Sequence, residues 1–143
     1  MTQLLASIGP IKLEPFIDPQ NARTMAAQPL PDITVARGTI LGMVSVAGAT
    51  LGKVGPYSAA NADGTQVPVG PSVYDFVTDA GGNAVYGPAG ATFGLSRGFE
   101  ETVPYYWKGT FLETDLTGLD ANAVTKLGAR EIGIGTAKML HLG

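Results

Sequence analysis

The sequence contains no cysteine and only one histidine, His141. Without cysteine, the chain can form no disulfide, thiolate metal site or cysteine nucleophile. A single histidine cannot supply the multi-histidine zinc sites of common metalloenzymes, and a Ser-His-Asp triad would have to use His141 as its base. We therefore expect a protein that is not an enzyme and that holds no metal and no cofactor.

Positive charge and long apolar runs are also scarce. Charged residues make up 15% of the chain, the net charge is −3, and lysine and arginine form no cluster. A nucleic-acid-binding surface is normally basic, so we expect no nucleic-acid partner. No apolar run approaches the ~20 residues of a membrane helix, and residues 1–7 lack the basic start and apolar run of a signal peptide. The sequence thus predicts no membrane partner.

Glycine and proline are abundant instead, with 20 and 10 residues in a chain of 143. This composition favours strands joined by tight turns over long helices, and a chain of this length forms one ordinary domain. We expect a single mainly β domain over residues 33–143. Its expected strands lie at 39–46, 66–69, 72–77, 105–112, 132–134 and 138–142, with a hairpin partner at 49–54 and turns at 61–64 and 79–83.

One short helix is expected near residues 120–128. Asp120 can cap its N-terminus, Val124 and Leu127 give it a buried face, and Gly128 can end it. Upstream, residues 85–104 are rich in glycine and predict a long loop with one strand near 91–95.

Residues 1–32 differ from the rest of the chain and predict an extended N-terminal arm. They hold five of the ten prolines, which block helix formation, yet they are too apolar for a plain disordered tail. Fully extended, about 30 residues reach on the order of 100 Å. Either this arm binds another subunit or it completes the core of its own domain. The apolar side chains expected to make its contacts are Ile8, Ile11, Leu13, Phe16 and Ile17.

Few carboxylates are placed for acid–base or metal chemistry. Glu100 and Glu101 are adjacent, so on a strand they would point to opposite faces. Glu113 and Asp115 could share a face, which is the minimum for a carboxylate pair or a hard-metal site. They follow a predicted strand, where solvated charge is usual, so we expect them on the surface.

The densest aromatic cluster is formed by Tyr105, Tyr106 and Trp107. On a regular strand Tyr105 and Trp107 would share one face, and Tyr106 would point to the other. One face would belong to the core. Either all three side chains belong to the core, or the other face exposes a large amphipathic ring of the kind that is enriched at interface hot spots, which makes these residues candidates for a subunit or partner interface.

Three segments, in this order, resemble the lambda-type phage head decoration protein family. Residues 39–44, Thr-Ile-Leu-Gly-Met-Val, are similar to the opening strand of that family. Residues 63–70, Asp-Gly-Thr-Gln-Val-Pro-Val-Gly, resemble its turn running into an apolar strand. Residues 109–111 and 119–132 are similar to its late strand, short helix and closing glycine. The resemblance covers roughly residues 33–80 and 105–135.

The resemblance implies a small β-clip-like or barrel-like domain that forms homotrimers over the three-fold sites of an expanded capsid. It further implies that the N-terminal arm joins the major capsid protein by strand addition. Such a protein would be made in the host cytoplasm and would end on the exterior of the virion capsid. Residues 85–104 have no counterpart in the family, and the arm is longer than expected.

Besides a purely intracellular binding module, two other functions fit the same residues. A tail or fibre adaptor of the virion would have a similar β-rich composition and would bind a tail or a glycan but no capsid shell. A small enzyme would have to use Glu113 and Asp115 as its acid–base or metal pair.

Overall fold

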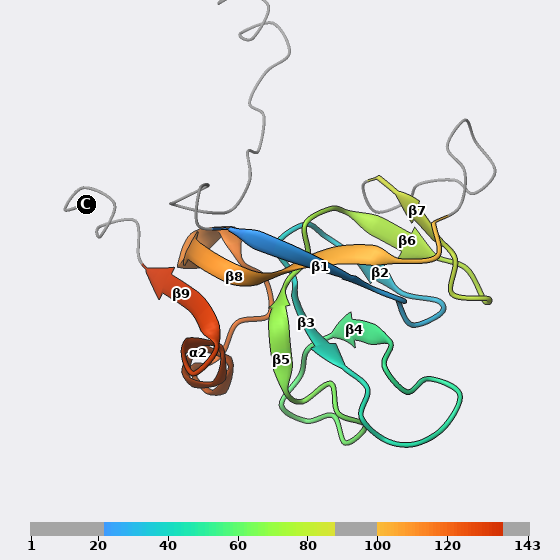
Figure 1. Cartoon of the computed structure of the whole chain (residues 1–143), viewed down its shortest axis with the longest axis horizontal. Helices are drawn as coiled ribbons and strands as arrows, with labels where there is room; N and C mark the ends of the chain where they lie inside the picture. Colours follow the sequence, from blue (N-terminus) through green and yellow to red (C-terminus); the bar gives the residue numbers. More distant parts are fainter. Residues whose placement is uncertain (1–21, 88–99, 136–143) are drawn as a thin grey trace, which may run out of the picture.

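The computed structural model describes residues 22–87 and 100–135, which form a mainly β domain with one short α-helix (Figure 1). This confirms the predicted fold class. The strands are β1 (Arg23–Ala27), β2 (Thr34–Val35), β3 (Ile40–Met43), β4 (Val54–Pro56), β5 (Pro68–Pro71), β6 (Phe76–Thr78), β7 (Ala84–Tyr86), β8 (Val103–Leu112) and β9 (Glu131–Gly135). A 3₁₀ turn, η2 (Glu113–Asp115), and the helix α2 (Ala121–Gly128) lie between β8 and β9.

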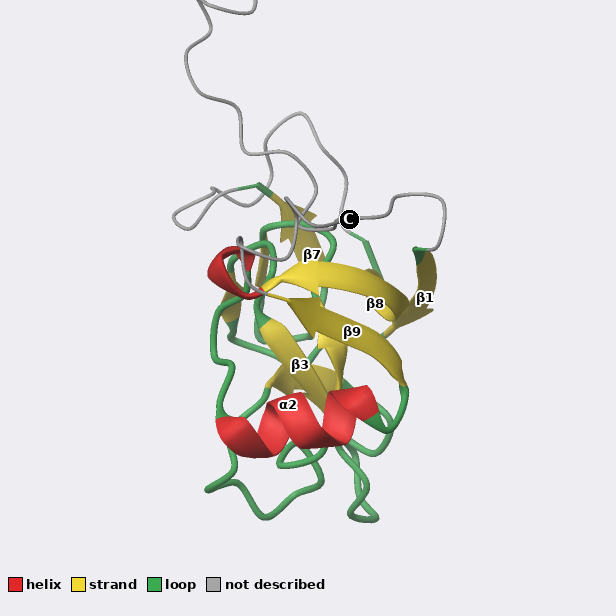
Figure 2. Ribbon diagram, turned by 90° about the vertical axis from the view of Figure 1, so that its left-hand side faces the viewer, coloured by secondary structure: helices red, strands yellow, loops and turns green. Residues whose placement is uncertain are grey.

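The strands form three small sheets with the orders β1-β8-β9, β4-β3-β5 and β2-β6-β7. Every pair is antiparallel except β8 with β9, which are parallel. Two parallel strands that are neighbours in a sheet need a crossover connection. The connection from β8 to β9 contains the helix α2 (Figure 2). Within the described ranges the sheets do not close into a barrel.

The longest strand, β8, carries a bulge at Trp107. Arg23 of β1 faces Lys108 and Thr24 faces Tyr106, so β8 has one residue more than β1 in this interval. An inserted residue reverses the alternation of side chains after it. Tyr105 and Tyr106 precede the bulge and are buried in different hydrophobic clusters, whereas Trp107 at the bulge is 37% exposed. The expectation that Tyr105 and Trp107 share one face was wrong.

The interior consists of two hydrophobic clusters, and β8 contributes to both. The first cluster contains Val35, Leu41, Val54, Val69, Phe76, Ala84, Val103 and Tyr105. The second contains Ile40, Tyr57, Val73, Tyr106, Phe111, Ala123, Leu127 and Ile132. The phase change at the bulge places Tyr106 and Phe111 together in the second cluster, where their ring centroids are 5.2 Å apart.

Residues 22–32, which were expected to belong to the arm, are part of the domain. β1 pairs with β8 along five residues, and Pro29 is fully buried. The Leu30 amide donates a hydrogen bond of 2.8 Å to the Val54 carbonyl. The expected boundary after residue 32 therefore falls inside the folded unit, because this stretch completes its own sheet and core. The arm residues Ile8, Ile11, Leu13, Phe16 and Ile17 lie outside the described residues.

The helix α2 confirms the predicted cap and end. Asp120 Oδ1 accepts a hydrogen bond of 2.7 Å from the Ala123 amide, as an N-capping residue does. The buried side chains of the helix are Ala123 and Leu127, which are four residues apart and so lie on one face. Val124 was expected to be buried but is 42% exposed, because the face that meets the core is centred on Ala123.

Other strand predictions were partly correct. The hairpin partner of β3 is β4, which begins only at Val54, and residues 44–53 form the connection. β5 runs through Gly70 and Pro71 instead of ending before them. Gly70 is required there because a Cβ at this position would lie within 1.7 Å of the Tyr106 carbonyl oxygen. Of residues 72–77, only Phe76 and Val77 belong to a strand, β6.

The predicted turn at 79–83 is present and joins β6 to β7. Asp79 Oδ1 accepts hydrogen bonds of 2.9 Å from the amides of Gly81 and Asn83. The strands expected near 91–95 and at 138–142 fall outside the described residues. None of the helices in the described ranges has the length and apolar character needed to span a membrane.

Candidate functional site

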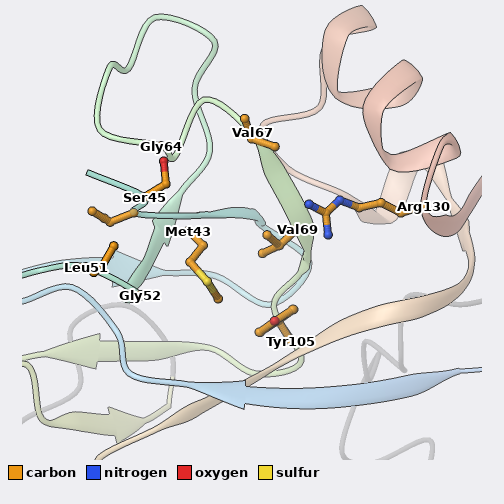
Figure 3. A pocket seen from close by; sticks show the side chains of 10 residues that line it. Met43, Ser45, Leu51, Gly52, Gly64, Val67, Val69, Tyr105 and Arg130 are labelled. Atoms are coloured by element: carbon orange, nitrogen blue, oxygen red, sulfur yellow. The ribbon is translucent and has the colours of Figure 1, made fainter. Parts of the chain in front are cut away.

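An apolar groove of about 500 Å³ lies where β3, β5 and β8 meet the turn before β9 (Figure 3). Its lining comes from segments that are far apart in the sequence. The residues that line it are Met43, Val44, Ser45, Leu51, Gly52, Gly64, Val67, Val69, Tyr105 and Arg130.

The groove has a buried floor and exposed apolar walls. Val69 and Tyr105 are buried, whereas Leu51 is 56% and Val67 is 39% exposed. Met25 of β1 extends the same face, because it is the register partner of Tyr105 and is itself 53% exposed. The Tyr105 hydroxyl lies 4.0 Å from Met25 Sδ. A cluster of large, exposed apolar side chains is more often a protein-binding surface than a surface that stays in contact with water.

Arg130 places one positive charge at the rim of the groove. Only Ala129 separates it from α2, and Figure 3 shows its side chain reaching toward Val69. Among the described residues it forms no ion pair. Burial raises the pKa of Tyr105, and the nearby Arg130 charge opposes this shift. The groove is therefore suited to an apolar side chain that has an acidic group next to it.

The wall that carries Val67 is held by a network of side-chain hydrogen bonds in the turn at residues 63–66. Asp63 Oδ1 accepts from both the amide and the hydroxyl of Thr65, and the Gly64 amide donates to Gln66 Oε1 at 2.7 Å. The Thr65 hydroxyl is the main reason why the pKa of Asp63 lies below its usual value. The Ser45 amide donates to the Asp63 carbonyl at 2.8 Å, which ties the turn to the end of β3.

The close approach of this turn to β3 depends on two glycines. A Cβ at Gly42 would lie 2.2 Å from the Thr65 carbonyl oxygen. A Cβ at Gly64 would lie 2.3 Å from the Ser45 amide nitrogen, and Gly64 also has a positive φ of 111°. Two of the three segments that carry the family resemblance are thus in direct contact.

The third segment joins the first of them through the second hydrophobic cluster. Phe111 from β8 and both buried residues of α2 pack in that cluster with Ile40 of β3. Tyr57 is the residue that follows β4, and its hydroxyl donates a hydrogen bond of 2.9 Å to Asp120 Oδ1. The third segment therefore packs against the first, and the first is in contact with the second.

The three aromatic candidates have different positions. Tyr105 forms part of the groove floor, Tyr106 is in the core, and Trp107 is exposed at the bulge of β8. The sequence reasoning missed Met25, Leu51 and Val67, because their shared surface exists only after two sheets, β1-β8-β9 and β4-β3-β5, have packed. A large apolar residue beside glycine, as at Leu51 and Gly52, is the only local signal for any of them.

The carboxylates considered for catalysis do not converge. Glu113 and Asp115 are in η2, where three residues per turn point them to different sides. Glu100 pairs through its backbone with Ala84. Within residues 22–87 and 100–135, no group of three or more metal-ligating side chains is present.

The glycine-rich segment at residues 38–42 leads into strand β3 and not into a helix, so it has no helix N-terminus to hold a phosphate.

Comparison with models of known protein families finds no match, and comparison with curated protein sequences finds none either.

Proposed function

We propose that this chain is a non-enzymatic decoration protein of a phage head. In this proposal it binds the outside of an expanded capsid as homotrimers at the three-fold sites and bridges neighbouring capsomers. It is made in the host cytoplasm and resides on the capsid exterior of the virion. Its partners are the major capsid protein and further copies of itself.

The observation that carries the proposal is the packing of the three resembling segments against one another. Gly42 touches Thr65, and Phe111 shares a cluster with Ile40, Ala123 and Leu127. Short motifs that match a family by chance need not meet in space. Motifs that build one fold must do so, and these segments do.

The arm fits strand addition to the capsid protein, a mode in which main-chain hydrogen bonds supply the affinity. The arm candidates Ile8, Ile11, Leu13, Phe16 and Ile17 precede β1, which is an edge strand of its sheet. The groove and the exposed Trp107 are the surfaces for contacts between subunits or with the shell. Linked weak contacts multiply affinity, and binding only to the assembled lattice stabilises that lattice.

The test is co-sedimentation of the purified protein with expanded, undecorated capsids. We expect saturation at roughly one copy per capsid subunit. Deleting residues 1–17 should leave a folded domain, because β1 begins at Arg23, and should weaken capsid binding strongly. A matched full-length control exchanges Lys12 and Glu14, which keeps the length, the charge and the apolar positions of the arm.

Unchanged capsid binding by the truncated protein would refute the role of the arm. A tail or fibre adaptor is the second candidate function. Binding to purified tails or to host glycans, with none to capsid shells, would favour it over decoration.

A further inference from the structure

Arg37, two residues after β2, has a guanidinium group with unmet hydrogen-bonding capacity. Its Nε and Nη2 atoms are buried, and neither has a hydrogen-bond partner among the described residues. The side chain forms no ion pair within residues 22–87 and 100–135 either. Arg37 as a whole is partly buried, but buried N–H groups without an acceptor are costly, so these two groups call for an acceptor from outside the domain.

The two unpaired atoms are on the same edge of the guanidinium. Nε and Nη2 direct their N–H bonds in nearly parallel directions, which is the geometry that receives the two oxygens of one carboxylate. This edge is also the one that needs an acceptor in Arg37. The geometry therefore favours a planar, two-oxygen ligand over a single water molecule.

The pocket around Arg37 is built by one end of the β2-β6-β7 sheet. Arg37 follows β2, Asp75 precedes β6, and Tyr86 ends β7, so the antiparallel order brings them to the same end. The pocket has a volume of about 170 Å³ and is lined by Arg37, Tyr74, Asp75, Tyr86 and Gly87. This size suits a carboxylate group and a short stem.

Main-chain and ring contacts hold this pocket in place. Asp75 Oδ1 accepts a hydrogen bond of 2.6 Å from the Arg37 amide, and the Gly87 amide donates to the Asp75 carbonyl at 2.9 Å. The rings of Tyr74 and Tyr86 are 5.2 Å apart, and the Tyr86 hydroxyl donates to the Thr102 carbonyl at 3.0 Å. These contacts define the walls of the pocket. A carboxylate reaches Nε and Nη2, which are closed to solvent in the free domain, when a side chain of the wall moves aside.

Nearby negative charge limits what can bind. Asp75 lines the pocket, and Glu100 is close enough to add to the effect of burial in raising the pKa of Tyr86. A dianion such as phosphate would be repelled by both carboxylates. A single carboxylate brings half that charge and matches the Arg37 fork.

We propose that the Arg37 pocket is a binding site for a carboxylate group. The carboxylate belongs either to a small free acid or to an aspartate or glutamate side chain of a protein bound at this end of the sheet. The site does not depend on the proposed decoration function, because it rests on Arg37 and its pocket alone.

The first experiment titrates the isolated full-length protein with sodium acetate at constant ionic strength, with sodium chloride as the balancing salt. NMR follows the Arg37 Nε–H signal and the ring protons of Tyr74 and Tyr86. We expect a saturable shift of these signals with acetate. Arg37→Lys keeps the charge and loses the fork, so it should weaken acetate binding by roughly tenfold or more. Arg130→Lys, at an exposed arginine, is the matched control and should leave acetate binding unchanged.

The absence of a saturable shift in the unmodified protein would overturn the proposal. So would equal acetate affinity in the Arg37→Lys variant. The shift of the Arg37 Nε–H signal in the unmodified protein needs no variant, so the proposal stays testable if the substitution affects folding.

The second arm separates the two sources of the carboxylate. Capsid co-sedimentation of Arg37→Lys is compared with that of the unmodified protein. Weaker capsid binding by the variant, together with competition by acetate, assigns the carboxylate to an acidic side chain of the shell. Unchanged capsid binding together with the acetate shift assigns it to a free acid. If the protein binds no capsid at all, the decoration proposal fails, while the acetate titration still decides the site.

Discussion

The hydroxyl of Tyr57 donates one bifurcated hydrogen bond to the two carboxylate oxygens of Asp120, at 2.9 and 3.2 Å. Asp120 is also the N-cap of α2, and Asn122 Nδ2 donates to the Tyr57 hydroxyl oxygen at 2.8 Å. The start of the helix is thereby tied to the chain that follows β4. The cap and the tertiary contact use the same carboxylate.

We expect Tyr57→Phe to lower the free energy of unfolding by about 1 kcal/mol, because the partly buried hydrogen bonds of its hydroxyl to Asp120 and Asn122 are lost. Asp120→Ala should cost about 1 kcal/mol from the cap and more from the unpaired Tyr57 hydroxyl. The double variant should be less destabilised than the sum of the two. Urea unfolding of all four proteins measures the coupling, and additive effects would show that the two residues act independently.

Acid should destabilise the domain through Asp63. Because its pKa is lowered in the folded protein, its stabilising contribution is present above its usual pKa of 3.8 and is lost as the pH falls through the folded value. The melting temperature of the unmodified protein should therefore fall in this acidic window. Asp63→Asn should have a flatter profile there, although Asp79, whose pKa is also lowered, continues to contribute. Identical profiles would contradict the role of Asp63.

Gly42→Ala should destabilise the domain by about 1–3 kcal/mol, because the added methyl meets the Thr65 backbone and no flexible side chain can give way. Gly128→Ala is the matched control. Gly128 ends α2 with open space around its Cα, so alanine there should be neutral or should stabilise by up to about 1 kcal/mol. Thermal and urea unfolding of both variants check this contrast.

Charge placed in the groove should block binding without unfolding the domain. Leu51→Asp changes a wall residue that is already 56% exposed, so its melting temperature should stay close to that of the unmodified protein. Its affinity for capsids or for further copies of the chain should fall by roughly tenfold or more. Val124→Asp introduces the same charge on the outer face of α2 and should bind normally. Equal binding by both variants would exclude the groove as an interface.

The fluorescence of Trp107, the one tryptophan of the chain, reports on the bulge of β8. In the free protein we expect a red-shifted emission that iodide quenches, because the side chain is 37% exposed. If the bulge lies at a capsid or subunit contact, the emission should shift to the blue and quenching should fall when the complex forms. A spectrum that is unchanged in a complex of demonstrated stoichiometry would remove Trp107 from the interface.

Local chemistry was predictable from the sequence, and long-range pairing was not. Asp120 as a cap and the turn at 79–83 depend on a few neighbouring residues, and both were found as predicted. The bulge at Trp107 depends on how β8 aligns with β1, about 80 residues earlier, and no local pattern encodes that register. The same holds for β9, whose parallel pairing with β8 follows from the path of α2.

The groove could not be predicted from the sequence for the same reason. Its residues come from positions 43 to 130, and each looks ordinary in its own segment. Arg37 could not be predicted as a binding residue either. It is a candidate because no described acceptor lies near its buried Nε and Nη2 atoms. Burial and unmet hydrogen bonds are properties of the packed chain.

The pairing of β1 with β8 also has a mechanical consequence. A pull on the chain before Arg23 that acts along β1 loads the hydrogen bonds of this antiparallel pair in parallel, so they must shear together instead of opening one after another. The load then passes to β8, which is anchored in both hydrophobic clusters. Tension on the N-terminal end is thus carried through β8 into both hydrophobic clusters instead of opening β1 alone.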